Sequence, residues 1–581
     1  MISSDVRTRF LMAAFLLAGV IVFFRLFTWQ VLQSDVLAAA ARSQHQTSTT
    51  LQAKRGSILA SDGFPLIASR ESFLVWTNNS RIKEKEIVAD KLSTLFIAHE
   101  KIEESSDSGK IREQLAKDEK DRIKKLLERQ NAYWVPIKHK VSKEIKEQIE
   151  NLNISGIGFD PQESMEYPEG TMAARMLGFV GKDSAGQDKG YFGLEGFYDL
   201  TLSGSRGAWD WEKDAFGNPI VLGESLKVGA MDGMDLKTTI DRTVQFITEK
   251  HLIEGINKYD AVSGLAVVID PRDGSILASA SIPSYDPSRF STYKSEDYID
   301  PVVGEAFEPG SIFKVLVMAA ALDAGVVDPD NKCDTCSGPR KIAEYTISTG
   351  TGEYHPDSTP ADIIRNSDNV GMIWVSEKMG IDKFYDYITR FGIGQPTGVD
   401  LQGETNPPLR PKKEWRPIDL ATASFGQGVA VTPMQMVRAV SVLANGGKLP
   451  TPRVVDKVVS QDLEEAVRYP SPVQVISPKA VRQITDMMTS AVDSRSDMWI
   501  KPKQIKVAGK TGTAQVPIAG HYDPEKTIAS FIGFAPADNP KFVMIVSLKD
   551  PKAAPFASQT AAPLWFSIAN DLFPYLKIMP R

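Results

Sequence analysis

The strongest pattern in the chain is one apolar segment close to its N-terminus. Residues 10–32 are almost continuously apolar, with Arg25 as their only charged residue. As a helix this segment would rise about 34 Å, enough to cross a bilayer core of about 30 Å. Arg7 and Arg9 precede it, and the positive-inside tendency keeps residues 1–9 in the cytoplasm. The pattern predicts a single transmembrane helix with the rest of the chain outside.

A cleaved signal peptide is the alternative interpretation of this segment. The small residues from Leu37 to Ala41 offer a cleavage site. The apolar segment is longer than the usual signal-peptide core of about 7–15 residues, which favours an uncleaved anchor. Trp29 suits the membrane–water interface on the side away from the cytoplasm, as it would in an anchor.

Between residues 33 and 233 the pattern changes several times. Apolar residues alternate over residues 54–68 around an Asp62-Gly63 turn signal, which predicts a β-hairpin. Residues 81–151 are rich in lysine and glutamate, with apolar residues at helical spacing. That pattern predicts a solvated helical subdomain. We assign residues 33–233 to one domain.

From residue 234 to residue 581 the apolar segments are typical of long, buried strands. Five are predicted, at residues 262–269, 275–281, 505–513, 528–534 and 542–548. Residues 310–447 are richer in helical periodicity, and a last amphipathic segment covers residues 560–572. Strands at both ends of a helical middle predict an α+β domain, with helices covering one antiparallel sheet.

Composition excludes one class of partner. The chain has 581 residues, of which 42% are apolar and 24% charged, with a net charge of −6. This length predicts two or three domains. The acidic balance provides no basic surface, so we expect no nucleic-acid partner.

The two cysteines, Cys333 and Cys336, leave several interpretations open. A structural zinc site needs four ligands, and no second Cys/His pair accompanies them, since the nearest histidine in sequence is His355. A local disulfide or a pair of idle thiols suits the sequence better. We predict no metal site.

Three short motifs stand in the C-terminal domain: Ser311-Ile-Phe-Lys314, Ser367-Asp-Asn369 and Lys510-Thr-Gly512. Each is weak alone, because matches this short occur by chance. A Ser-His-Asp hydrolase would need Gly-x-Ser-x-Gly, and a metal hydrolase would need His-Glu-x-x-His. The sequence contains neither. The order and the contexts of the three motifs therefore indicate the chemistry.

The first motif combines a nucleophile with a base. A Glu308-Pro-Gly310 turn places Ser311 at a helix start, where free backbone N–H groups can bind developing negative charge. Lys314 lies one turn further on the same face. It can accept the serine proton only if its pKa falls from about 10.4, and burial and a second cation such as Lys510 would both lower it. The alternative is a helix-capping serine with a solvated lysine.

The second motif offers a proton relay. Ser367 and Asn369 alternate with Asp368, so on an extended loop or turn both would point to one side. Ser367 could pass a proton to a leaving amine, and Asn369 could hold a substrate amide. The alternative is a surface turn.

The third motif provides a binding edge. Gly512 would let a substrate backbone lie close against the strand. Lys510, Thr511 and Thr513 would supply a positive charge and hydroxyls suited to a terminal carboxylate. Without the other motifs, this segment is a lysine between a strand and a turn.

The three motifs together resemble those of the penicilloyl-serine transferases. Further segments are similar to class B penicillin-binding proteins and extend the resemblance over most of residues 10–575: Arg55-Gly-Ser-Ile-Leu, Gly193-Leu-Glu-Gly, Asp270-Pro-Arg-Asp-Gly-Ser-Ile-Leu-Ala278, Pro283-Ser-Tyr-Asp-Pro287 and Glu308-Pro-Gly-Ser311. The resemblance implies a cytoplasmic tail, an anchor helix, an elongated non-catalytic pedestal over residues 33–233 and a transpeptidase domain over residues 234–581. The family's transpeptidase domain has a five-stranded antiparallel sheet covered by helices.

The resemblance also implies roles for the motif residues. Ser311 is the acylated nucleophile, Lys314 its base and Ser367 the relay. Asn369 positions substrate, Lys510 assists electrostatically, and Thr511 and Thr513 bind the substrate carboxylate. The backbone N–H groups of Ser311 and Thr513 form the oxyanion hole. The implied reaction attacks the D-Ala-D-Ala amide of a stem peptide, releases D-alanine and transfers the acyl group to an amine, without a cofactor.

Within class B, three segments are similar to the division-specific branch: Asn366-Ser-Asp-Asn-Val-Gly371, Ser424-Phe-Gly-Gln-Gly-Val-Ala-Val-Thr-Pro433 and Ala529-Ser-Phe-Ile-Gly-Phe-Ala-Pro-Ala-Asp538. The implied partners are peptidoglycan stem peptides, β-lactams, a polytopic membrane glycosyltransferase and other division proteins, at the septal cytoplasmic membrane. Two departures concern the pedestal: Glu166 stands where the family usually has a basic residue, and Ser61-Asp-Gly63 lacks the usual preceding Asp-Arg.

Three other functions remain as alternatives. A bifunctional class A enzyme would need a glycosyltransferase domain, and residues 33–230 contain no such motifs. A β-lactamase or β-lactam sensor shares the serine and lysine, and the deacylation rate distinguishes a lactamase from a transpeptidase. A non-enzymatic division scaffold would not need all the catalytic positions, which are filled here.

Overall fold

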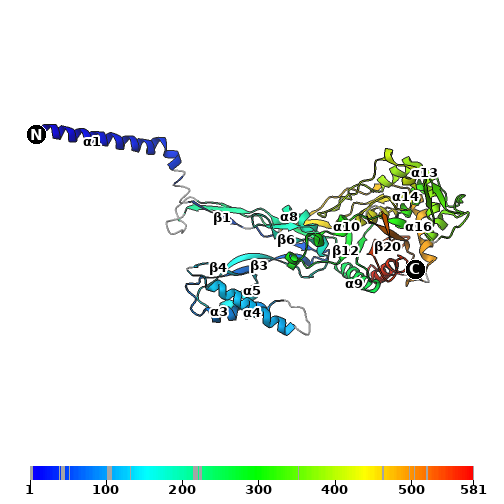
Figure 1. The fold of residues 1–581 in the computed structure, drawn as a ribbon, viewed down its shortest axis with the longest axis horizontal. Coiled ribbons are helices and arrows are strands. Elements are labelled where there is room, and N and C mark those ends of the chain that lie inside the picture. The colour runs from blue at the N-terminus through cyan, green and yellow to red at the C-terminus, as the bar shows by residue number, and fades with distance from the viewer. Residues whose placement is uncertain are drawn as a thin grey trace. The chain divides into compact units, whose positions relative to one another are not determined.

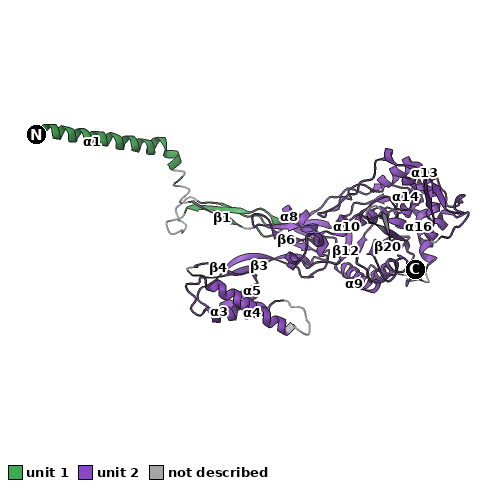
Figure 2. Cartoon of the chain, in the orientation of Figure 1, with its two compact units in different colours: residues 1–55, 203–233 green, residues 56–202, 234–581 purple. Residues whose placement is uncertain are grey.

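The computed structural model describes residues 4–37, 40, 46–51, 53–100, 108–130, 132–212, 220, 225–350, 352–460, 463–495, 498–500, 502, 504–518 and 521–579. The chain divides into two compact units, shown in Figure 2: residues 1–55 with 203–233, and residues 56–202 with 234–581. The domain boundaries after residues 9, 32 and 233 stay a prediction.

The first unit contains the apolar helix. α1 (Ser4–Phe27) continues into a π-helical turn, η1 (Thr28–Leu32). Residues 5–32 are long and apolar enough to cross a membrane, which is consistent with a single-pass anchor. Of the alternative cleavage site, Ala38, Ala39 and Ala41 lie outside the described residues. A three-stranded antiparallel sheet completes the unit, in the order β1 (Gln46–Leu51), β8 (Gly207–Glu212) and β9 (Ser225–Val228).

A mixed sheet runs through the second unit. The predicted hairpin is present, because β2 (Ile58–Leu59) pairs antiparallel with β3 (Pro65–Thr77). The sheet order is β17-β16-β10-β2-β3-β4, and β5 also pairs with β3; the remaining strands are β4 (Val135–Val141), β5 (Ile157–Glu166), β10 (Asp235–Thr238), β16 (Val455–Val459) and β17 (Glu464–Ala466). Its hydrogen bonds thus join residues 56–202 to two distant parts of the chain.

The predicted helical subdomain consists of α3 (Lys85–Ala98), α4 (Ser108–Leu127) and α5 (Lys143–Asn151), beside β3 and β4 (Figure 1). Only part of α4 is buried: Ile123 and Leu127 are inaccessible, whereas Ile111 and Leu115 are exposed. Glu166, one of the two departures, forms an ion pair of 2.9 Å with Arg70 on the paired strand. Short elements follow: α6 (Ala174–Leu177), β6 (Phe179–Lys182), β7 (Asp188–Tyr191), α7 (Gly193–Phe197) and α8 (Asp199–Ser203).

The five predicted strands form one antiparallel sheet. Its order is β12 (Ile276–Ile282), β11 (Ser263–Ile269), β21 (Phe542–Lys549), β20 (His521–Ala535) and β19 (Ala508–Ile518), so β19 is an edge strand. Helices α9 (Arg242–Tyr259) and α17 (Ala561–Tyr575) cover one face. The strands alternate between two cores: Ala266 and Val268 face these helices, whereas Val267 and Ile269 face the other side.

The helices of the other side position the motifs. They are α10 (Pro301–Gly304), α11 (Lys314–Asp323), α12 (Pro360–Asn366), α13 (Asn369–Arg390), α14 (Pro417–Ser424), α15 (Pro433–Ala444) and α16 (Pro478–Asp493). Minor elements complete the domain: η2 (Pro287–Thr292), η3 (Ser295–Tyr298), η4 (Gly310–Ile312), η5 (Lys412–Glu414), β13 (Arg340–Ile342), β14 (Tyr345–Ile347), β15 (Lys448–Leu449) and β18 (Val473–Gln474). The α+β prediction, with helices covering an antiparallel sheet, is confirmed.

Candidate active site

The Ser311 motif lies in a short turn that leads into a buried helix. η4 places Ser311 immediately before α11, so Lys314 is the first residue of that helix. Gly310 adopts φ +54°, a left-handed conformation that favours glycine, and its N–H donates to the Gly426 carbonyl at 3.0 Å. The Ser311 side chain is half-buried and forms no hydrogen bond within the part of the chain that the structure describes. Its hydroxyl therefore lies close to the N-terminus of α11 and is not held by another described residue.

Lys314 is fully buried and is the centre of the site. Its Nζ donates to the Ser367 carbonyl at 2.6 Å and to Asn369 Oδ1 at 2.7 Å, and lies 3.3 Å from Ser367 Oγ. A neutral amine has two N–H groups and one lone pair. If the two N–H groups serve the two short contacts, the lone pair remains available to accept a proton.

The second motif forms the junction between two helices. Ser367 caps the C-terminus of α12 with φ +56°, and Asp368 caps the N-terminus of α13 by accepting the Val370 N–H at 2.8 Å. The connection is thus a left-handed turn rather than an extended loop. Ser367 and Asn369 nevertheless both contact Lys314, as their alternation predicts, and Asn369 Nδ2 donates to the Ser348 carbonyl at 3.2 Å.

The third motif lies on the edge strand β19. Lys510 is 4% exposed, and its Nζ donates to Ser367 Oγ at 2.9 Å and to the Thr511 carbonyl at 3.0 Å. Thr513 Oγ1 accepts the N–H of Ala557 at 3.1 Å, so its own hydroxyl hydrogen can still be donated. The structure therefore brings Lys314, Ser367 and Lys510 together, although they are far apart in sequence.

The surroundings of Lys314 and Lys510 lower the pKa values of both side chains. Burial lowers the pKa of Lys314 well below its usual value, Lys510 lowers it further, and Asp368 opposes the shift. Burial, assisted by Arg495, lowers the pKa of Lys510 to about 7. The shift of Lys314 favours its neutral form, which is the form that can accept a proton, and Lys510 is partly protonated at neutral pH.

Gly512 faces the serine turn. A Cβ added there would lie 2.9 Å from Ile312 Cγ2 and 3.1 Å from the Pro309 carbonyl oxygen. Sequence reasoning assigned this glycine to close approach of substrate. The structure shows that close packing of β19 against η4 also requires it.

Sequence reasoning missed some supporting residues. A Cβ at Gly426 would lie 2.1 Å from the Gly310 carbonyl oxygen, so only glycine can pack against the serine turn there. The glycine-rich Ser424–Gly428 segment was the available signal. Ser348 acts through its backbone carbonyl and left no signal. Cys333 and Cys336 form a disulfide, which decides between the interpretations left open by the sequence.

The chain matches two families of known proteins. Residues 264–573 match the family described as "Penicillin binding protein transpeptidase domain", and residues 50–238 match "Penicillin-binding Protein dimerisation domain". The chain belongs to the class B penicillin-binding proteins. It is therefore a serine-type peptidoglycan D,D-transpeptidase.

Several relatives of this penicillin-binding protein are similar over most of their length. Stage V sporulation protein D of Bacillus subtilis is 32% identical and covers 100% of this chain and 88% of its own. Peptidoglycan D,D-transpeptidase FtsI of Escherichia coli is 29% identical over 77% of this chain and 73% of its own. A crystal structure of a peptidoglycan synthetase from Bifidobacterium adolescentis has a TM-score of 0.71 at 28% identity, covering 92% of this chain and 98% of that one. The division-specific branch stays a prediction.

Proposed function

We propose that this penicillin-binding protein forms an acyl-enzyme at Ser311 from D-Ala-D-Ala stem peptides and cross-links them in septal peptidoglycan during cell division. The observation that supports this chemistry is the position of the Ser367 hydroxyl. Its Oγ lies 3.3 Å from Lys314 Nζ and 2.9 Å from Lys510 Nζ. A proton that Lys314 takes from Ser311 has a path through this hydroxyl to the leaving amine.

In the acylation step, Ser311 Oγ attacks the carbonyl carbon between the two D-alanines while neutral Lys314 accepts its proton. The backbone N–H groups of Ser311 and Thr513 stabilise the oxyanion. The C–N bond then breaks, the nitrogen receives a proton through Ser367, and D-alanine leaves. An amine of a neighbouring strand attacks the ester, which restores the Ser311 hydroxyl and forms the cross-link.

Substrate would bind along the open edge of β19. Thr511, Thr513 and Lys510 of this strand would hold the terminal carboxylate, and Asn369 would orient the peptide amide. β-Lactams would acylate the same serine, because their strained amide mimics D-Ala-D-Ala and the bound fragment blocks the acceptor amine.

Labelling with a fluorescent penicillin tests this chemistry. We expect one slowly released adduct on the tryptic peptide that contains Ser311, none in Ser311→Ala, and normal labelling in the control Ser295→Ala at an exposed position. Absence of an adduct, or an adduct on another serine, would overturn the assignment. Rapid hydrolysis would indicate a β-lactamase instead.

The cellular part of the proposal rests on the similarity of three segments to the division-specific branch. It includes a septal location and a polytopic membrane glycosyltransferase as partner. Depletion should give filamentous cells, and a fluorescent fusion should collect at the septum. Normal division after depletion would contradict the septal role and leave the chemistry standing.

A further inference from the structure

A cavity of about 320 Å³ lies outside the candidate active site, with Arg438 of α15 in its wall. Thr397, Gly398, Thr451 and Tyr469 also line it, and no motif residue contributes. Its volume falls at the lower end of the range for sites that hold small organic molecules, about 300–1,000 Å³. The cavity can therefore accommodate a small ligand.

The Arg438 guanidinium has unused hydrogen-bond donors. Its Nε donates to the Pro450 carbonyl at 2.9 Å, and its Nη1 donates to the Pro396 carbonyl at 3.3 Å. A guanidinium carries five N–H donors, so three of them have no acceptor among residues 4–579 as far as these are described. An arginine in the wall thus keeps three N–H donors that the described part of the protein does not use.

The positive charge of Arg438 also lacks an ion pair within the part of the chain that the structure describes. None of the described carboxylates forms an ion pair with it. Glu404 acts on it electrostatically, but one oxygen of Glu404 already accepts the Thr397 N–H at 2.7 Å and the Thr397 hydroxyl. The guanidinium remains cationic at neutral pH.

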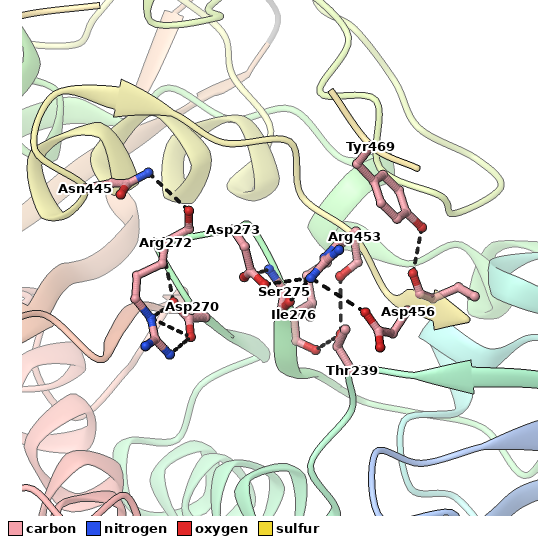
Figure 3. Close-up of polar contacts among 11 residues, drawn as sticks. Thr239, Asp270, Arg272, Asp273, Ser275, Ile276, Asn445, Arg453, Asp456 and Tyr469 are labelled. Carbon is pink, nitrogen blue, oxygen red and sulfur yellow. Dashed lines mark hydrogen bonds and ion pairs between the residues drawn. The ribbon is translucent and has the colours of Figure 1, made fainter. Parts of the chain in front are cut away.

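The neighbouring Arg453 shows the contrast. It forms ion pairs with Asp273 at 2.6 Å and with Asp456 at 3.7 Å, as Figure 3 shows. Its guanidinium carbon lies 5.4 Å from the ring centre of Tyr469, whose hydroxyl donates to Asp400 at 2.9 Å. Arg453 therefore has two carboxylate partners, whereas Arg438 has none among the described residues.

We propose that this cavity binds a small organic anion through its carboxylate or phosphate group. The planar guanidinium of Arg438 matches two oxygens of either group in a bidentate arrangement. The Thr451 hydroxyl offers a further donor, and Leu449 and Val473 give the carbon part of the ligand apolar contacts. Because a ligand that binds only the folded protein shifts the unfolding equilibrium, binding also raises the stability of the fold.

Ligand-observed NMR and thermal shift on the full chain in nanodiscs test the site. The probes are N-acetylglycine and glycerol 3-phosphate, and the matched neutral controls are N-acetylglycinamide and glycerol. We expect saturable binding of at least one anion and none of the neutral compounds. The tighter anion identifies the ligand as a carboxylate or a phosphate. The proposal is overturned if neither anion binds, or if the neutral controls bind equally.

Two substitutions locate the binding. Val473→Glu, on a rim residue that is 65% exposed, adds a carboxylate that competes for Arg438 and should weaken binding at least about 10-fold. Leu463→Glu, 57% exposed and outside the cavity, should have no effect. Arg438→Gln should also abolish binding. Unchanged binding in Val473→Glu refutes the site. Penicillin labelling of Ser311 in the same variants is independent of anion binding, so it shows whether the fold and the proposed function are kept.

Discussion

Replacing Gly512 by alanine tests the geometry of the serine turn most directly. The added Cβ would lie 2.9 Å from Ile312 Cγ2, 3.0 Å from Ile312 N and 3.1 Å from the Pro309 carbonyl oxygen. Favourable carbon contacts lie at about 3.5–4.0 Å, so β19 and η4 must separate by about half an ångström. Two of the three atoms belong to the backbone and cannot rotate away.

The cost follows from this separation. Overpacking costs about 1–3 kcal/mol of stability, and a misplacement of about 1 Å reduces a rate about 100-fold. We therefore expect Gly512→Ala to fold with a lowered melting temperature and to acylate about 10-fold more slowly. Stopped-flow measurement with a fluorescent penicillin gives the rate. Gly338→Ala is the control, because its Cβ would meet no atom within 4 Å.

Two outcomes would contradict this reasoning. An acylation rate equal to that of the unmodified protein would show that the turn and the strand tolerate the extra atom. A loss confined to bulky acyl donors would show that the substituent obstructs substrate, as the sequence interpretation implied. A uniform loss across donors supports displacement of Ser311.

Three further predictions concern other parts of the chain. The acylation rate should rise with pH as Lys314 loses its proton, and it should fall again near pH 7 as Lys510 loses its proton. In a pH–rate profile, Lys510→Arg should lack the fall on the alkaline side, because the arginine keeps its charge. Asp400, which is 3% exposed, accepts hydrogen bonds from two backbone N–H groups and two tyrosine hydroxyls. Asp400→Asn should therefore lower the free energy of unfolding, measured with denaturant, by about 2–4 kcal/mol. The control Asp330→Asn, at an exposed position, should leave it unchanged. Mass analysis of the protein from cells should find the anchor intact; a mature N-terminus near residue 40 would contradict this.

The sequence by itself determined the elements whose residues share one environment, such as a membrane or a buried core, from end to end. The apolar run to Leu32 predicts a spanning helix because no polar environment can hold so much apolar surface. The five strands were found because most of them carry apolar side chains that pack into the cores on both faces of the sheet. The three motifs indicated the chemistry, since a serine nucleophile needs a base close by.

Only the tertiary structure decided how distant residues meet. The left-handed turn at Ser367 and the contact of Gly426 with Gly310 depend on packing between separate segments, which periodicity does not report. The pairing of β2 with β10 joins segments far apart in sequence. Likewise, Arg438 and Arg453 are both ordinary arginines in the sequence. Only the positions of the surrounding carboxylates give Arg453 two ion pairs and leave Arg438 with none among the described residues.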